Sequence, residues 1–259
     1  TRPDILGVGV DPVDLDEAAA RVLGWASGRA VPARYVCVTG VHGVMVAEED
    51  GEFRSILNRA DMVVPDGMPL AVIGRLAGWP SMGRVFGPDF MLRVCAGSVP
   101  LGLRHFFYGG REGVAEDLAR RMQSVFPGLR VAGWHCPPFS PLGEGERDRV
   151  AELVNESAPD LVWVGLSTPK QERWMAEITP LLCAGVCLGV GAAFDYNTGR
   201  LRRAPRWMQA GCLEWVYRLI QEPTRLYRRY LWNNPRFLVK AAAQAAGLRR
   251  GRRKEGVRG

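Results

Sequence analysis

The chain has 259 residues, of which 47% are hydrophobic and 24% are charged, and its formal net charge at pH 7 is +7. This length suits one large α/β domain, or a domain with an appendage. No apolar run reaches the roughly 18–20 residues that a membrane span needs, and the first residues show no signal-peptide pattern. These features exclude a membrane-spanning helix and favour a cytoplasmic globular protein.

The positive charge is concentrated near the end of the chain. Residues 200–259 hold 16 basic and 3 acidic side chains, whereas residues 1–199 hold 18 basic and 24 acidic ones. An acidic body with a basic tail suits nucleic acid, an anionic membrane face or a phosphorylated ligand. We expect the last segment, LRRGRRKEGVRG at 248–259, to be disordered.

The cysteines and histidines give no sign of a metal site or of disulfides. No CxxC pair occurs, and most of the cysteines lie in apolar surroundings, which is typical of buried reduced thiols. His42, His105 and His135 lack the spacing of metal ligands, so we expect no metal. The six cysteines are Cys37, Cys95, Cys136, Cys183, Cys187 and Cys212.

The first predicted helix begins after Asp14, whose side chain can cap it, and Glu17 stands three residues later as in a capping box. Asp14 and Asp16 also form a DxD pattern, which binds a metal-nucleotide in many sugar transferases. Because this pattern opens an amphipathic helix, capping is the favoured interpretation.

Short apolar, β-branched or aromatic runs then alternate with helical stretches. Apolar strands that are separated by helices indicate a parallel sheet buried on both faces, so the predicted fold is a Rossmann-like α/β fold with helices on both sides. The predicted strands are 34–39, 60–64, 103–108, 129–134, 160–165 and 184–191.

The basic tail has a different pattern from the α/β body. We expect a catalytic α/β domain over 1–199 and a helical appendage over 200–247, with the disordered segment after it. Helices are predicted at about 205–221 and 224–247, with a break at Pro223.

Ligands of parallel α/β sheets bind at the carboxyl ends of the strands, so the residues that follow each strand are the candidates for chemistry. Glycines there, such as Gly109 and Gly110, allow backbone N–H groups to approach a phosphate. GVGAAFD (189–195) resembles a dinucleotide fingerprint, but its third glycine is missing and the signal for NAD is weak.

Asp66 lies between Pro65 and Gly67 at one of these strand ends. Proline fixes φ and glycine permits positive φ, so the pair can aim one carboxylate at a fixed point. An ordinary turn has the same composition, and the tripeptide alone leaves both interpretations open. His42 also lies on this rim, where a helix-start role is equally compatible with its position. We expect His105, inside LRHFFY, to be a core residue with satisfied hydrogen bonds.

Seven motifs across about residues 5–238 together resemble the WecG/TagA/CpsF family of bacterial glycosyltransferases, glycosyltransferase family 26. Each motif alone is modest, but their order along the chain is highly specific. The motifs are TGVHGVM, NRADMVVPDGMPL, RVFGPDFM, FYGGREG, VGLSTPKQE, GVGAAFDYNTGRLRRAP and LEWVYRLIQEPTRLYRRYL.

The resemblance implies an inverting transferase that needs no metal and no cofactor. Such enzymes move an N-acetylmannosamine-type sugar from a UDP-sugar to an undecaprenyl-diphosphate-linked N-acetylglucosamine, in the synthesis of cell-surface polysaccharide or teichoic acid. They work at the cytoplasmic face of the cell membrane, where we expect this protein to be peripheral. The sequence leaves open whether it forms a homo-oligomer away from the membrane.

The resemblance also implies roles for particular residues. Asp66 matches the aspartate that acts as the general base, and Arg84 matches an arginine near the donor. Three tail arginines match those that close over the donor diphosphate, and Thr39 and Gln171 match polar pocket residues. From their strand-end positions we also expect the glycines of the FYGGREG motif to lie beside the diphosphate, and His42 and Asp195 to lie in the pocket. The tail arginines are Arg218, Arg225 and Arg228, the glycines are Gly109 and Gly110, and the pocket residues are Thr39, His42, Gln171 and Asp195.

One position departs from the family pattern. Many members carry an asparagine two residues after the threonine that corresponds to Thr39, and Val41 occupies that place here. A contact to donor or acceptor is therefore lost, replaced or moved to His42. This departure bears on the identity of the sugar, which could be another hexose or a uronic acid, more than on the class of reaction.

The aromatic residues of the tail are interleaved with arginine, as expected of a helix that lies at a membrane interface. They could instead pack on the body beside a solvated basic helix. Nucleic-acid binding is the alternative from another class, but it gives Asp66 and the strand-end glycines no role, so we expect no nucleic acid. A nicotinamide-dependent oxidoreductase is a weaker alternative. The aromatics are Trp207, Trp215, Tyr217, Tyr227, Tyr230, Trp232 and Phe237.

Overall fold

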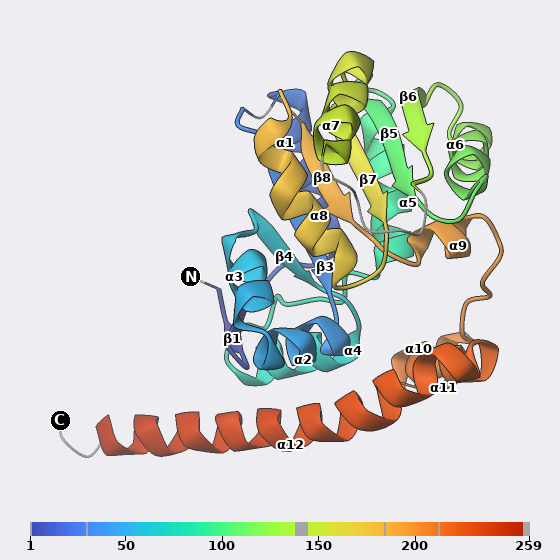
Figure 1. Cartoon of the computed structure of the whole chain (residues 1–259). Helices are drawn as coiled ribbons and strands as arrows, with labels where there is room; N and C mark the ends of the chain where they lie inside the picture. The colour runs from blue at the N-terminus through green and yellow to red at the C-terminus, as the bar shows by residue number, and fades with distance from the viewer. Residues whose placement is uncertain (1, 30, 138–144, 184, 212, 256–259) are drawn as a thin grey trace.

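A six-stranded parallel sheet forms the centre of the protein in a computed structural model of the chain (Figure 1). The structure describes residues 2–29, 31–137, 145–183, 185–211 and 213–255. The strand order is β4-β3-β8-β7-β5-β6. The predicted α/β fold is confirmed.

Each predicted strand is present, with ends that shift by about two residues or less. In β3, β4, β5, β7 and β8 the runs of apolar residues are buried on both faces, as the lack of alternation indicates, whereas the outer strand β6 is partly exposed. The strands are β3 (Arg34–Thr39), β4 (Met62–Pro65), β5 (Arg104–Gly109), β6 (Arg130–His135), β7 (Leu161–Gly165) and β8 (Val186–Gly189).

Helices cover both faces of the sheet and enclose two hydrophobic clusters. One face is covered by α2 (Val41–Glu49), α3 (Gly51–Arg59), α7 (Glu146–Ser157) and α8 (Lys170–Ile178). The other is covered by α1 (Leu15–Ser27), α5 (Gly87–Ser98), α6 (Val114–Val125) and α9 (Ala193–Asn197). Two further short elements are α4 (Met68–Leu76), which follows β4, and the 3-10 turn η1 (Thr179–Leu181).

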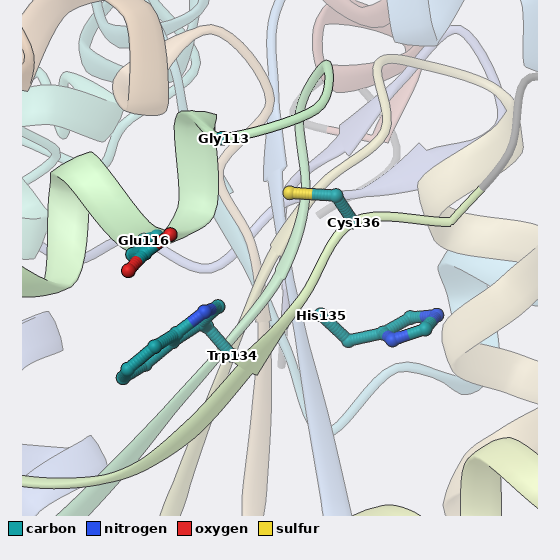
Figure 2. A pocket seen from close by; sticks show the side chains of 5 residues that line it. All are labelled: Gly113, Glu116, Trp134, His135 and Cys136. Carbon is teal, nitrogen blue, oxygen red and sulfur yellow. The ribbon is translucent and has the colours of Figure 1, made fainter.

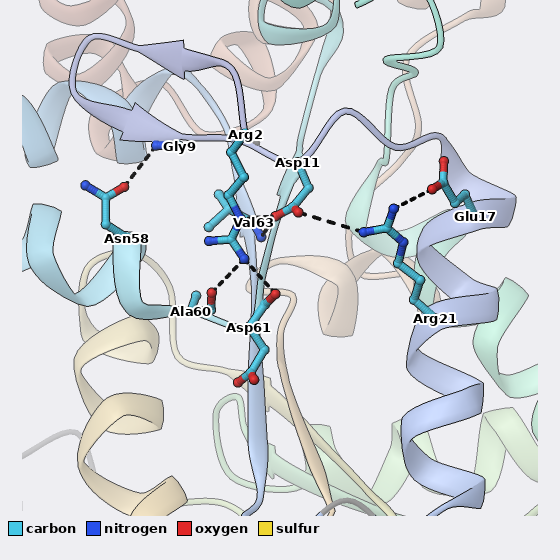
Figure 3. Close-up of polar contacts among 9 residues, drawn as sticks. All are labelled: Arg2, Gly9, Asp11, Glu17, Arg21, Asn58, Ala60, Asp61 and Val63. Carbon is cyan, nitrogen blue, oxygen red and sulfur yellow. Dashed lines mark hydrogen bonds and ion pairs between the residues drawn. The ribbon is translucent and has the colours of Figure 1, made fainter.

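The N-terminal segment completes the edge of the sheet at β4. A short antiparallel hairpin, β1 (Asp4–Ile5) and β2 (Val8–Gly9), leads into Asp11, which is 7% exposed. Asp11 exchanges two hydrogen bonds with the Val63 backbone, at 2.7 and 2.8 Å, and forms an ion pair with Arg2 at 2.9 Å (Figure 3). This contact satisfies backbone groups of an edge strand and fixes β4, which ends next to Asp66.

The predicted cap of the first helix is confirmed, because the Asp14 side chain accepts a hydrogen bond from the Glu17 N–H at 2.8 Å. Asp16 instead forms an ion pair with Arg93 at 2.6 Å. The two carboxylates of the DxD pattern therefore serve separate structural contacts.

His105 is a core residue, as predicted. It is fully buried, and its Nδ1 accepts a hydrogen bond from Trp163 Nε1 at 2.9 Å while its Nε2 lies 2.8 Å from Ser98 Oγ. Burial lowers the pKa of His105 to about 3, so the ring is neutral.

The cysteine prediction is right for three positions and wrong for two. Cys37, Cys95 and Cys187 are buried free thiols whose pKa burial raises. The other two are free thiols as well, but Cys136 is only half-buried at the margin of the core and Cys183 is exposed, because each lies beyond the end of a strand. Cys212 lies outside the described residues.

The tail forms three helices and packs along the body. The first predicted tail helix is divided into α10 (Arg206–Ala210) and α11 (Glu214–Gln221), because the chain turns at Gly211. The break before Pro223 is confirmed, and α12 (Pro223–Glu255) continues into the segment predicted to be disordered. Residues 256–259 lie outside the described part. No helix of the described chain is both long enough and apolar enough to cross a bilayer.

The contact between α12 and the body runs along α2 (Figure 1). Leu226, Phe237 and Ala241 bury their side chains on this side of α12. Arg236 forms an ion pair with Glu49 at 2.5 Å, and Lys240 forms one with Glu48. The tail is therefore a docked part of the folded protein.

Candidate active site

A hollow at the carboxyl ends of the central strands lies between the sheet and the tail. Its sheet side is formed by residues that follow β4, β7 and β8, and its other side by residues from α9, α11 and α12. The lining includes Asp66, Ser167, Thr168, Gln171 and Gly191 on the first side, and Tyr196, Arg218, Arg225 and Arg229 on the second.

The loop after β4 holds Asp66 at the edge of this hollow. The Asp66 N–H donates to the Thr39 carbonyl at 2.8 Å, which ties the loop to the neighbouring strand. Gly67 then takes a φ of 96°, a conformation that disfavours other residues. A Cβ at Gly40 would lie 3.0 Å from the Asp66 carbonyl oxygen, so the two loops approach closely. The backbone that carries the carboxylate is thus held in place on both sides of Asp66.

The surroundings of Asp66 shift the pKa of its carboxyl toward neutral pH. Burial raises its pKa to about 6, and Glu214 acts in the same direction. Arg84, Arg218 and Arg229 oppose this effect by favouring the charged form. A carboxyl with such a pKa can accept a proton from a hydroxyl group that is placed beside it.

Three of the predicted arginines lie at or beside the hollow, and each is paired with a tail carboxylate. Arg84 contacts Glu214 at 2.5 Å and stacks on the Phe86 ring at 4.5 Å. Arg218 and Arg225 share Glu222, at 2.8 and 2.6 Å. The two that line the hollow are Arg218 and Arg225, whereas Arg84 approaches Asp66 from outside the lining.

The structure does not bring Arg228 to the hollow. Its side chain is exposed, and its Nε donates to the Tyr227 hydroxyl at 2.8 Å. The next residue, Arg229, lines the hollow instead. The i, i+4 spacing of Arg225 and Arg229 is the sequence signal that could have identified it, because such residues share one face of a helix.

Of the predicted polar residues Gln171, Thr39 and Asp195, only Gln171 lines the hollow. Gln171 lines the hollow, and its Nε2 donates to Glu172 Oε1 at 3.0 Å, an oxygen that also accepts from Thr168 Oγ1 at 2.8 Å. Thr39 is buried, with no partner for its hydroxyl among the described residues, and is not part of the lining. Asp195 is half-buried and also outside the lining, and burial raises its pKa.

His42 lies behind the wall of the hollow, at the start of α2. Its Nδ1 is 3.0 Å from Asn233 Nδ2 on α12, and it makes a hydrogen bond with the backbone of Thr168. It is therefore a link between the tail and the wall, and it does not line the hollow.

Gly109 and Gly110 pack closely against the end of β7, and their role in binding phosphate stays a prediction. A Cβ at Gly109 would lie 2.7 Å from the Gly165 carbonyl oxygen, and its φ is 122°. The Gly110 N–H already donates to that oxygen at 3.0 Å. Neither glycine lines the hollow.

A second, open hollow lies at the outer strand β6 and is lined by Gly113, Glu116, Trp134, His135 and Cys136 (Figure 2). His135 and Cys136 point in different directions there. Glu116 pairs with Arg120 at 2.6 Å, and the His135 ring stacks on Tyr108. In the described part of the chain, no group of three His, Cys, Asp or Glu residues could hold a metal ion.

Comparison with known proteins identifies the family of the chain. The model of the glycosyl transferase WecG/TagA/CpsF family matches residues 3–251. The chain is 31% identical over 185 residues to an N-acetylglucosaminyldiphosphoundecaprenol N-acetyl-beta-D-mannosaminyltransferase of Bacillus spizizenii, covering 71% of this chain and 70% of the relative. It is 30% identical over 182 residues to the protein of that name from Bacillus subtilis, covering 70% and 69%. The chain belongs to the WecG/TagA/CpsF family of glycosyltransferases.

Proposed function

We propose that this glycosyltransferase moves an N-acetylmannosamine-like hexosamine from a UDP-sugar to an undecaprenyl-diphosphate-linked N-acetylglucosamine-type acceptor. The names of the two Bacillus relatives support both the sugar and the acceptor. The observation that carries the proposal is a single carboxyl, Asp66, held at the strand ends among arginines. The product would serve cell-surface polysaccharide or teichoic acid synthesis.

Asp66 acts in this proposal as the general base of an inverting displacement. Its carboxylate takes the proton of the acceptor hydroxyl while the hydroxyl oxygen attacks the anomeric carbon. The new glycosidic C–O bond forms as the bond from the anomeric carbon to the diphosphate breaks, and UDP leaves with that electron pair. The pKa of Asp66, about 6, leaves most of the carboxyl ionised at neutral pH and still basic enough to take part.

The departing diphosphate needs cations or backbone donors around it. Arg218 and Arg225 line the hollow and Arg84 lies beside Asp66, so guanidinium groups can supply this charge without a metal. Gln171 provides a neutral polar group on the opposite wall. The tail thus contributes to the site and also covers it.

The outer side of the tail supports a peripheral position on the inner face of the cell membrane. Large apolar side chains are exposed on α10–α12, beside a high density of basic residues. Aromatic and aliphatic side chains of this kind insert at the interface, and arginine favours anionic lipid. Trp215 and Phe237 instead pack on Tyr230 and the body. The exposed group is Trp207, Ile220, Tyr227, Leu231, Trp232, Leu238 and Val239.

Turnover with a panel of UDP-sugars tests the proposal directly. A short-chain lipid-diphosphate N-acetylglucosamine serves as acceptor, and each reaction runs with and without excess EDTA. We expect UDP-N-acetylmannosamine to be the preferred donor and EDTA to have no effect, because arginines supply the charge. Preference for another UDP-hexose or a UDP-uronic acid would revise only the sugar. Loss of activity on chelation, restored by Mg²⁺ or Mn²⁺, would contradict the arginine-based account.

A further inference from the structure

Four arginines lie at or beside the hollow, and they differ in whether a carboxylate already pairs with them. Arg84 pairs with Glu214, and Arg218 and Arg225 both pair with Glu222. Arg229 forms no ion pair with any described residue. Its buried Nε has no hydrogen-bond partner there, which is also true of the Nε atoms of Arg84 and Arg218. Its guanidinium lies 5.9 Å from the adjacent Tyr230 ring. Of the four, it is the cation whose charge is least neutralised by a direct contact.

A cation that is withdrawn from water and has no ion pair, such as Arg229, lowers the stability of the folded protein. Burial lowers the pKa of Arg229, yet a guanidinium stays protonated at neutral pH. The charge therefore persists at the wall of the hollow, where Arg218 and Arg225 add to the positive potential. An anionic group in the hollow would relieve this cost.

The geometry of α12 separates Arg229 from its neighbour Arg228. Successive residues of a helix turn by about 100°, so adjacent side chains point to different sides. Leu226, Asn233 and Phe237 mark the side of α12 that faces the body, and Arg229 lies close to that side. Arg228 lies with the exposed Tyr227 and Trp232 on the outer side.

We propose that Arg229 is a donor-binding residue that contacts the diphosphate of the nucleotide sugar, and that Arg228 lies outside the site. This inference rests on the proposed function, because it takes the anion to be the UDP diphosphate. A guanidinium can donate two parallel hydrogen bonds to phosphate oxygens, and Arg229 lines the hollow in which the diphosphate would lie.

Arg229 also influences the pKa of Asp66, so its replacement should change the pH dependence of kcat/KM. A residue that only supports the fold would not have this effect. The charged or titratable groups near Asp66 are Arg84, Glu214, Arg218, Arg229 and Tyr196. Removing the Arg229 charge disfavours the Asp66 carboxylate, so the pKa of Asp66 rises above about 6. The acid limb of the kcat/KM profile then moves to higher pH.

The test compares three full-length variants: Arg229→Gln, Arg229→Lys and the matched control Arg228→Gln. UDP affinity is measured by calorimetry without lipid, and the pH profile is measured with donor and acceptor. We expect Arg229→Gln to weaken UDP binding about tenfold or more and to shift the acid limb upward. Arg229→Lys keeps the charge, so it should retain the position of the acid limb and recover part of the affinity. Arg228→Gln should leave UDP affinity and the acid limb unchanged.

Two outcomes would overturn the inference. One is an Arg229→Gln variant that melts like the wild type and binds UDP equally well. The other is a loss of UDP affinity in Arg228→Gln that matches or exceeds the loss in Arg229→Gln. Failure of the wild type to bind UDP at all is a different result, because it would refute the proposed function itself.

Discussion

Asn233 on α12 lies 3.0 Å from Nδ1 of His42 on α2, and this contact joins the tail to the wall of the active site. Burial lowers the pKa of His42 to about 3, and Arg229 acts in the same direction, so the ring is neutral and Nδ1 can accept the hydrogen bond. The other hydrogen bond of His42 goes to the backbone of Thr168, which lines the hollow. Docking of α12 is thereby linked to the loop after β7.

Replacing Asn233 with alanine removes the donor and leaves His42 Nδ1 buried without a partner. The expected cost is on the order of 1 kcal/mol of docking free energy. Hydrogen exchange should therefore rise in α12 and in residues 167–169, while the core strands keep their protection. Asn234→Ala is the matched control, since no described hydrogen bond involves that side chain. Equal exchange in both variants would show that Asn233 does not hold the tail.

Glu172 has a positioning role that can be tested by two substitutions. Its Oε1 accepts from Gln171 Nε2 and from Thr168 Oγ1, and the side chain is buried. Glu172→Leu removes both contacts and should raise KM for the UDP-sugar several-fold, because Gln171 loses its fixed orientation. Glu172→Gln keeps an acceptor oxygen and should restore most of the affinity. An unchanged KM in the Glu172→Leu variant would show that Glu172 does not position Gln171 for binding the UDP-sugar.

Asp66 should destabilise the folded protein when it is ionised. Its pKa in the folded state is about 6, above the 3.8 of an unperturbed aspartate, so folding favours the protonated form. Stability contributed by this group is therefore lost as the pH rises from about 4 to above 6. Asp66→Asn cannot ionise, so its melting temperature should exceed that of the wild type at pH 7–8. The difference should vanish below pH 4; a constant difference across this range would contradict the assigned pKa.

Membrane association should depend on the exposed tryptophans of the tail. Trp207 and Trp232 are 67% and 66% exposed, and interfacial tryptophans anchor peripheral proteins. Changing both to alanine should weaken sedimentation with anionic liposomes while UDP affinity stays the same. Leu76→Ala, at a residue of the body that is 77% exposed, is the control. Equal liposome binding by all three proteins would assign the membrane contact elsewhere.

The sequence predicts the sheet well because most of its strands are buried on both faces. Runs such as RYVCVT and DLVWVG have no polar face that helical periodicity could explain, and the structure places β3 and β7 there. The capping of α1 by Asp14 is equally local. The β1–β2 hairpin was missed because its strands have two residues each, and Asp11 acts through a partner that is 52 residues away.

The site is harder to predict, because the residues that form it come from separate elements. Asp66 is identifiable from its loop, but Arg228 and Arg229 are adjacent, and only the rotation of α12 after Pro223 separates them. Gly109 and Gly110 have the composition of a phosphate loop, yet the close approach of β5 and β7 is a further reason for glycine there. The roles of these arginines and glycines depend on tertiary packing, which cannot be predicted from local sequence patterns.

The turnover number of Asp66→Asn on UDP-N-acetylmannosamine and a lipid-diphosphate N-acetylglucosamine acceptor is the most direct test of the account. The amide preserves the shape of the side chain but cannot take the proton of the acceptor hydroxyl. We predict that kcat falls by about 100-fold or more, the usual scale for a lost general base, while UDP affinity stays within a few-fold of the wild type. A variant that keeps near-normal kcat on these substrates would contradict the role of Asp66 and the mechanism built on it.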